Sequence, residues 1–173
     1  TYDSFVRSGA ALPEEKRGRF KEVKAELAQL SLQFSQNNIK ETNDFVLHLT
    51  QREDLAGLPD SQIEQAAAAA AERQLEGWVF TLHAPSFGPF MQYAENRALR
   101  ERMYRAYMTR CAHDNARNNF EICKKLVNLR MEMAQLLGFP CYADYVLKKR
   151  MAQTPERVYN LLEELKTHYL APA

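Results

Sequence analysis

Apolar residues recur at intervals of three and four along most of this chain, and this periodicity limits its fold more than any other feature. The first stripe consists of Phe20, Val23, Leu27, Leu30 and Phe34. A second stripe consists of Phe120, Cys123, Leu126, Val127, Met131, Ala134 and Leu137. A third consists of Val158, Leu161, Leu162, Leu165 and Tyr169. Residues at these spacings share one face of an α-helix, so each stripe predicts an amphipathic helix with one buried side.

Capping residues predict where these helices begin and end. Pro13 suits the first position of a helix that we expect to run to about Thr42. Thr154-Pro155-Glu156 combines an N-cap, a proline and an acid, which is typical of a helix start. Gly9 is expected to end an initial helical segment, and Gly138 to end the second stripe in a Schellman-type cap.

Two short segments interrupt the helical pattern. Residues 45–49 and 78–82 are rich in β-branched and aromatic side chains, so each predicts a short strand. An alanine-rich helix from about residue 60 to 74 connects them, and we expect the two strands to pair. The following segment, residues 85–89, contains two prolines and a glycine and is expected to be an irregular loop. The predicted fold is mainly α, with about six helices and two short strands.

Composition and charge exclude several classes of protein. Of the 173 residues, 46% are hydrophobic and 26% are charged, which is typical of a soluble domain with a core. The formal net charge of +1 provides no basic face for nucleic acid or for an anionic membrane surface. The chain begins at Thr1 without an apolar leader, so we expect a cytoplasmic location and a sequence that belongs to a longer one.

The cysteines offer neither a disulfide framework nor a metal site. There are three of them, Cys111, Cys123 and Cys141, and no two are separated by only two residues. Cys123 falls on the second apolar stripe, so we expect it in the core rather than as a nucleophile. Cys111 and Cys141 lie near helix ends and could be partly exposed.

No catalytic or metal-binding residue is assigned from the sequence. The histidines are His48, His83, His113 and His168; none is followed by Glu, and no two are four residues apart. A His-Glu-x-x-His zinc motif is therefore absent, and this chain is expected to bind no zinc itself. The sequence also lacks a phosphate-binding glycine loop and a G-x-S-x-G nucleophile motif.

Residues 78–93 form the densest aromatic segment. Its aromatic side chains are Trp78, Phe80, Phe87, Phe90 and Tyr93. They could line a peptide groove, or they could fix the segment onto the core. We favour core packing, and the residues that bind substrate stay unassigned.

Seven segments, taken in order, carry a resemblance to a known family. They are GAALPE from Gly9, LAQLSLQFSQN from Leu27, DLAGLP from Asp54, WVFTLHAP from Trp78, YAENRALRERMYRAYMTR from Tyr93, AQLLGFPCY from Ala134 and MAQTP from Met151. At these distances they resemble the N-terminal half of the thimet-oligopeptidase family of zinc metallopeptidases, which includes oligopeptidase A and peptidyl-dipeptidase. The resemblance covers essentially the whole chain.

The resemblance implies a helical ellipsoid with a deep channel that admits short peptides. In that family, two histidines of a His-Glu-x-x-His helix and a more distant Glu bind zinc, and the Glu of the motif activates the metal-bound water. These residues have no counterpart here. We therefore expect residues 1–173 to be a non-catalytic part of the channel wall, with the zinc and the catalytic domain elsewhere in the parent polypeptide.

The expected partners are short peptides, bound by the parent enzyme, and the remainder of the same polypeptide, which would cover apolar surface on this part. Two rival interpretations remain: a free-standing helical protein-interaction module and a helical bundle that binds a small molecule. The sequence does not decide between endopeptidase action and the removal of C-terminal dipeptides.

Overall fold

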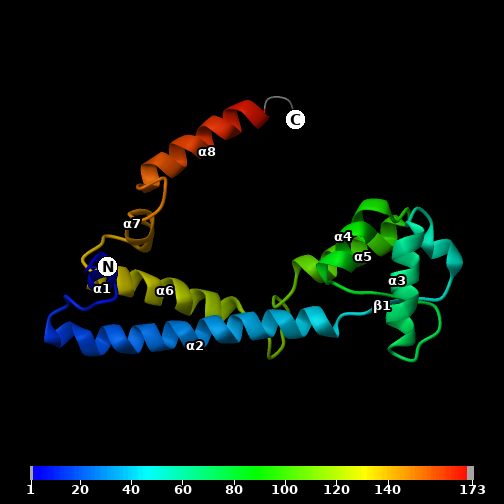
Figure 1. The fold of residues 1–173 in the computed structure, drawn as a ribbon, viewed down its shortest axis with the longest axis horizontal. Coiled ribbons are helices and arrows are strands. Elements are labelled where there is room, and N and C mark those ends of the chain that lie inside the picture. Colours follow the sequence, from blue (N-terminus) through cyan, green and yellow to red (C-terminus); the bar gives the residue numbers. More distant parts are fainter. Residues whose placement is uncertain (1, 171–173) are drawn as a thin grey trace. The chain divides into compact units, whose positions relative to one another are not determined.

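The computed structural model describes residues 2–170 and is mainly α-helical, as the periodicity predicts (Figure 1). The described residues form eight α-helices, one 3₁₀ turn and two strands. In chain order these elements are α1 (Tyr2–Arg7), α2 (Glu14–Asp44), β1 (Leu47–Leu49), η1 (Arg52–Leu55), α3 (Asp60–Ala71), β2 (Trp78–Phe80), α4 (Ala84–Tyr93), α5 (Arg97–Met108), α6 (Phe120–Leu136), α7 (Tyr142–Leu147) and α8 (Pro155–Leu170).

The chain divides into two compact units. One contains Thr1–Ser31 and Ile122–Ala173, and the other contains Leu32–Glu121. The long helix α2 and the helix α6 each contribute residues to both units.

The second unit is organised around a two-stranded antiparallel sheet. β1 pairs with β2 in the register Leu47↔Phe80, His48↔Val79 and Leu49↔Trp78, which confirms the predicted pairing. Leu47 and Leu49 are buried while His48 is exposed, the alternation expected of a strand with one face on a core. The helices α3 and α4 pack against β2. The core also includes Leu55, Leu58, Ala66, Leu82, Ala94 and Met103.

The loop predicted for residues 85–89 is wrong, because these residues lie within helix α4. Pro85 occupies the second helical position, where its missing N–H leaves no intrahelical bond unmade. Pro89 lies further inside the helix, where proline is unfavourable. Phe90, the next residue, is completely buried and its ring centroid lies 4.7 Å from that of Phe80. We infer that this burial stabilises α4 against the effect of its prolines.

Two helices of the first unit, α1 and α6, end at the predicted glycines, Gly9 and Gly138. At the end of α6 the Phe139 N–H donates to Ala134 O at 2.9 Å and the Gly138 N–H to Gln135 O at 3.0 Å. This is the Schellman pattern, and Gly138 has the positive φ of 82° that it requires. Arg19 on α2 donates two hydrogen bonds to the Glu132 carboxylate on α6, at 2.6 and 2.8 Å, so the two helices are also joined by a bidentate ion pair.

The predicted buried face of α6 is partly wrong. Leu126 and Ala134 are buried as expected, but the other buried residues of this helix are Ile122 and Leu129. The predicted stripe residues that are exposed are Phe120, Cys123, Val127 and Met131. The helix has apolar residues on two faces, and periodicity alone does not say which of them meets the core.

Candidate functional site

The described residues contain no cluster of three or more His, Cys, Asp or Glu side chains that could hold a metal ion. The four histidines are exposed and lie on different elements: His48 on β1, His83 before α4, His113 after α5 and His168 on α8. His48 Nε2 lies 2.6 Å from Glu76 O, and His113 Nε2 lies 3.2 Å from Thr109 Oγ1. The first contact is with a backbone carbonyl and the second with a hydroxyl, so neither brings a second metal-binding side chain to the imidazole.

Most of the aromatic segment packs onto the core. Phe80 and Phe90 are buried, and Trp78 and Phe87 are partly buried against the same core cluster. Tyr93 alone among the five predicted aromatics is exposed. The favoured interpretation of this segment is therefore correct for four of its five rings.

A polar network joins the C-terminal part of α2 to the loop between α5 and α6. Glu41 accepts hydrogen bonds from the Cys111 N–H at 2.6 Å and from Asn115 Nδ2 at 3.1 Å. Asn37 Nδ2 donates to Asn119 Oδ1 at 2.9 Å, and both of these amide side chains are buried. Glu41 thus holds a backbone N–H of the loop and Asn37 holds a side chain of it, each across 70 or more residues of sequence.

The network lowers the pKa of Glu41. Partial burial alone would raise the pKa of this carboxyl group, because it disfavours the charged form. Two hydrogen bonds, from Cys111 and Asn115, stabilise the ionised form, and so do the charges of His113 and Arg117. Together they outweigh the effect of burial, so the pKa of Glu41 lies below its ordinary value of 4.5. Glu41 is accordingly ionised at neutral pH, where it is an acceptor only.

A cleft of about 290 Å³ lies beside this network, between α2, α4 and the end of α5. Its lining residues are Asn38, Ile39, Thr42, Asn43, Leu82, His83, Ala84, Tyr107 and Arg110. The cleft is open and carries amide, hydroxyl, imidazole and guanidinium groups, which can donate to and accept from the backbone of an extended peptide.

A stacked ring and two hydrogen bonds position Arg110 in this cleft. Its guanidinium carbon lies 3.8 Å from the centroid of the Tyr107 ring, which in turn stacks on Phe87 at 4.2 Å with an interplanar angle of 16°. Its Nη1 donates to Thr42 Oγ1 at 2.8 Å and its Nε to Tyr107 O at 3.0 Å. Nothing in the sequence singles out Arg110 or Glu41, because each contacts residues that lie far away along the chain or across a turn.

The expectations for two of the cysteines are wrong. Cys123 is exposed, since it lies on the outward face of α6, and Cys111 is buried. Cys111 follows α5, but the loop folds back so that its N–H meets Glu41 and its carbonyl accepts from the Asn119 N–H at 2.8 Å. Burial, with the nearby Glu41 charge, raises the pKa of the Cys111 thiol, so this residue is not an activated nucleophile.

The chain is similar to known peptidases. Residues 90–171 match the model of Peptidase family M3. Oligopeptidase A of Haemophilus influenzae is 40% identical over 165 residues, which are 93% of this chain and 24% of that protein. The chain belongs to peptidase family M3. The probable cytosolic oligopeptidase A of Arabidopsis thaliana is 39% identical over 175 residues, 97% of this chain and 25% of that protein.

The dipeptidyl carboxypeptidase of Escherichia coli, another similar protein, is 32% identical over 165 residues, 95% of this chain and 24% of that protein. The M3 chain described here thus spans about a quarter of the length of the curated relatives that it matches. The family match begins within α4 and includes Tyr107 and Arg110 of the cleft, together with all of α5 to α8. No helix among the described residues is long and apolar enough to cross a membrane.

Proposed function

We propose that this chain is a non-catalytic part of a zinc-dependent oligopeptidase and forms a portion of the wall of its substrate channel. The observation that carries the proposal is the 40% identity to an oligopeptidase A over 93% of the chain but only 24% of that relative. The parent polypeptide would hydrolyse short peptides, and its zinc would be bound by residues outside 1–173.

The residues present do not fit a zinc site. The sequence contains no His-Glu-x-x-His motif, and the described residues bring together no three His, Cys, Asp or Glu side chains. We therefore assign no catalytic step to this chain. Its contribution to the reaction is to shape the channel and to exclude folded proteins, for which long helices such as α2 and α6 are suited.

A cytoplasmic location fits the same proposal. All three cysteines are free thiols, which suits a reducing compartment, and one of the relatives is described as a probable cytosolic enzyme.

The test compares this 173-residue chain with the longer protein from the same gene. Both are incubated with a quenched fluorescent short peptide, and their zinc content is measured by elemental analysis. We expect the longer protein to hold about one zinc per molecule and to cleave the peptide, because family members keep one open catalytic zinc site. We expect the chain alone to hold none and to be inert. Stoichiometric zinc or cleavage by the chain alone would show that the proposal is wrong.

A further inference from the structure

A cavity of about 360 Å³ lies in the first unit, where α1, α6 and α7 end. Its volume falls within the range of about 300–1,000 Å³ that is usual for small-molecule sites. Half of the six described lining residues are cationic and half are apolar, so the cavity combines positive charge with an apolar surface. The lining residues are Val6, Arg7, Leu137, Phe139, Lys148 and Lys149.

The guanidinium of Arg7 is fixed beside this cavity but lacks an acceptor for one of its nitrogens. Its Nη2 donates to Tyr145 O at 2.7 Å, and its Cζ lies 4.1 Å from the centroid of the Tyr145 ring. Its Nη1 is buried and has no hydrogen-bond partner among the described residues. A buried donor without a partner is unfavourable, and more so when the group is charged. Arg7 therefore calls for an acceptor that the described part of the chain does not supply.

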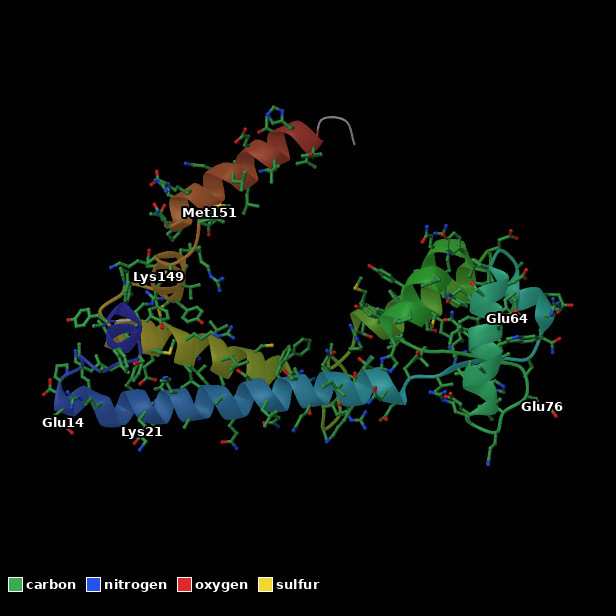
Figure 2. All side chains as sticks on the ribbon, in the orientation of Figure 1. Glu14, Lys21, Glu64, Glu76, Lys149 and Met151 are labelled. Atoms are coloured by element: carbon green, nitrogen blue, oxygen red, sulfur yellow. The ribbon has the colours of Figure 1, made fainter. Side chains whose placement is uncertain are left out.

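Lys148 brings a second positive charge to the same aromatic cluster. Its Nζ lies 5.5 Å from the centroid of the Phe139 ring, and that ring meets the Tyr145 ring edge-on with centroids 5.4 Å apart. Arg7 and Lys148 thus each lie over one ring of an adjoining pair. Lys149, labelled in Figure 2, is the third cation of the lining.

The helix dipoles do not account for this arrangement. Positive side chains near a helix C-terminus are ordinary, because they offset the partial negative charge of the last carbonyl groups. That explains why cations lie where helices end. It does not explain a buried Nη1 of Arg7 that meets no carbonyl or carboxylate of the described residues, whereas an anion in the cavity does.

We propose that this cavity binds the carboxylate of a small apolar molecule, of the size of one amino-acid residue with an aliphatic side chain. Arg7 can give the carboxylate a charge-assisted hydrogen bond, and Lys148 can add a second. Val6, Leu137 and Phe139 provide an apolar surface for the rest of the molecule. That surface favours a carboxylate with an apolar body over inorganic phosphate, which has none.

This inference goes beyond the proposed function and does not rest on it, because it concerns a binding site of this chain rather than cleavage by the parent enzyme. Zinc content and cleavage test the function, whereas titration with a carboxylate tests the site. A longer protein that cleaves peptides would retain the function even if the cavity bound nothing, and the reverse also holds.

The experiment titrates the 173-residue chain, labelled with ¹³C in its methyl groups, with N-acetyl-leucine and follows the NMR signals of Val6 and Leu137. We expect saturable shifts of both, with a dissociation constant in the millimolar range. N-acetyl-leucinamide has the same apolar body without the charge and should bind at least about tenfold more weakly. No saturable shift, equal binding of acid and amide, or the same shifts and affinity with inorganic phosphate would each overturn the proposal.

The tripeptide Gly-Gly-Leu distinguishes the two sources of such a carboxylate. Binding at least as tight as that of N-acetyl-leucine would assign the site to peptide C-termini. Saturable but weaker binding would assign it to single residues, and both results retain the carboxylate site.

Variants of the chain test the two cations. Arg7→Gln should weaken the binding of N-acetyl-leucine at least about tenfold, because it removes the buried guanidinium. Since Arg7 also contacts Tyr145, Lys148→Gln provides a second variant at an exposed residue and should weaken binding at least about threefold. Lys21→Gln is the matched control, because it removes one positive charge from an exposed residue of α2 in the same unit (Figure 2). Equal weakening by Lys148→Gln and Lys21→Gln would show that only the net charge matters, and would overturn the proposal.

Discussion

Cys111 and Cys123 show how a residue's position in a helical pattern differs from its environment in the folded chain. The sequence places Cys123 on an apolar stripe and Cys111 at a helix end, yet Cys111 is buried and Cys123 exposed. The reason is that burial of Cys111 depends on Glu41, 70 residues earlier, which fixes the loop. Local periodicity contains no information about such a contact.

The two thiols should therefore differ in reactivity. We expect iodoacetamide at pH 7.5 to modify Cys123 at least about tenfold faster than Cys111, since Cys111 is inaccessible and its pKa is raised. Peptide mapping by mass spectrometry at successive times gives both rates in one sample. In urea the two rates should become similar, and equal rates in the native protein would contradict the buried position of Cys111.

Glu41 should make the stability of the chain depend on pH. Its folded pKa lies below the unfolded value, so its ionised form stabilises the fold above about pH 4.5 and this contribution is lost as the pH falls through the folded pKa. We expect Glu41→Gln to lower the free energy of unfolding by about 1 kcal/mol at pH 7, and by less at pH 4. Urea titrations at both values measure the difference.

The control for Glu41 is Glu64→Gln, which changes an exposed carboxylate on α3 (Figure 2). It should alter the free energy of unfolding by less than about 0.5 kcal/mol at either pH. A Glu41→Gln effect that is the same at pH 4 and pH 7 would mean that the amide replaces the carboxylate in shape only, and that the charge contributes nothing.

At the scale of elements, sequence reasoning succeeded where local signals agree and failed where they conflict. The C-terminal end of α6, the N-terminal end of α8 and the β1–β2 pairing were predictable because the local signals at each place agree. Helix α4 was missed because its prolines predict a loop, while the burial of Phe90 that stabilises it is a tertiary effect. On α6 the periodicity offered two faces, and only the rest of the fold selects between them.

Alanine substitutions at two glycines, one beside the small sheet and one within a helix, should change the stability in opposite directions. Gly77 precedes β2 with φ of 92°, and a Cβ there would overlap the Leu49 carbonyl on β1. We expect Gly77→Ala to reduce stability by about 2–4 kcal/mol, since both the backbone conformation and the contact become unfavourable.

Gly18→Ala on α2 is the comparison, because its added Cβ meets no atom within 4 Å. It should instead stabilise the protein by up to about 1 kcal/mol. Thermal unfolding of both variants gives the sign, and a loss at Gly18 or no loss at Gly77 would contradict the local geometry.

At the scale of the whole molecule, the lack of a His-Glu-x-x-His motif can be read from the sequence, whereas the cleft beside Arg110 cannot. Histidine spacing is a property of the chain itself, so the missing zinc motif needs no structure. The cleft combines side chains from residue 38 to residue 110, which become neighbours only when α2, α4 and α5 assemble. The family resemblance covered these residues but assigned them no role.

The apolar stripe of helix α8, which we call the α8 seam (Val158, Leu161, Leu162, Leu165 and Tyr169), gives the last prediction, which concerns the behaviour of the 173-residue chain in solution. Several large apolar side chains along one helix face water, and a second copy can cover them when no linked partner is present. We expect the weight-average sedimentation coefficient to rise with concentration from about 1 to 100 μM, and the rise to be reduced by Leu161→Gln with Leu165→Gln. Tyr159→Gln changes a large exposed residue of α8 that lies outside the seam, and it should leave the sedimentation coefficient unchanged if the seam mediates the association. A sedimentation coefficient that is constant over this range would indicate that the seam is covered within the chain itself, by a rearrangement of α8 against α6 or α7.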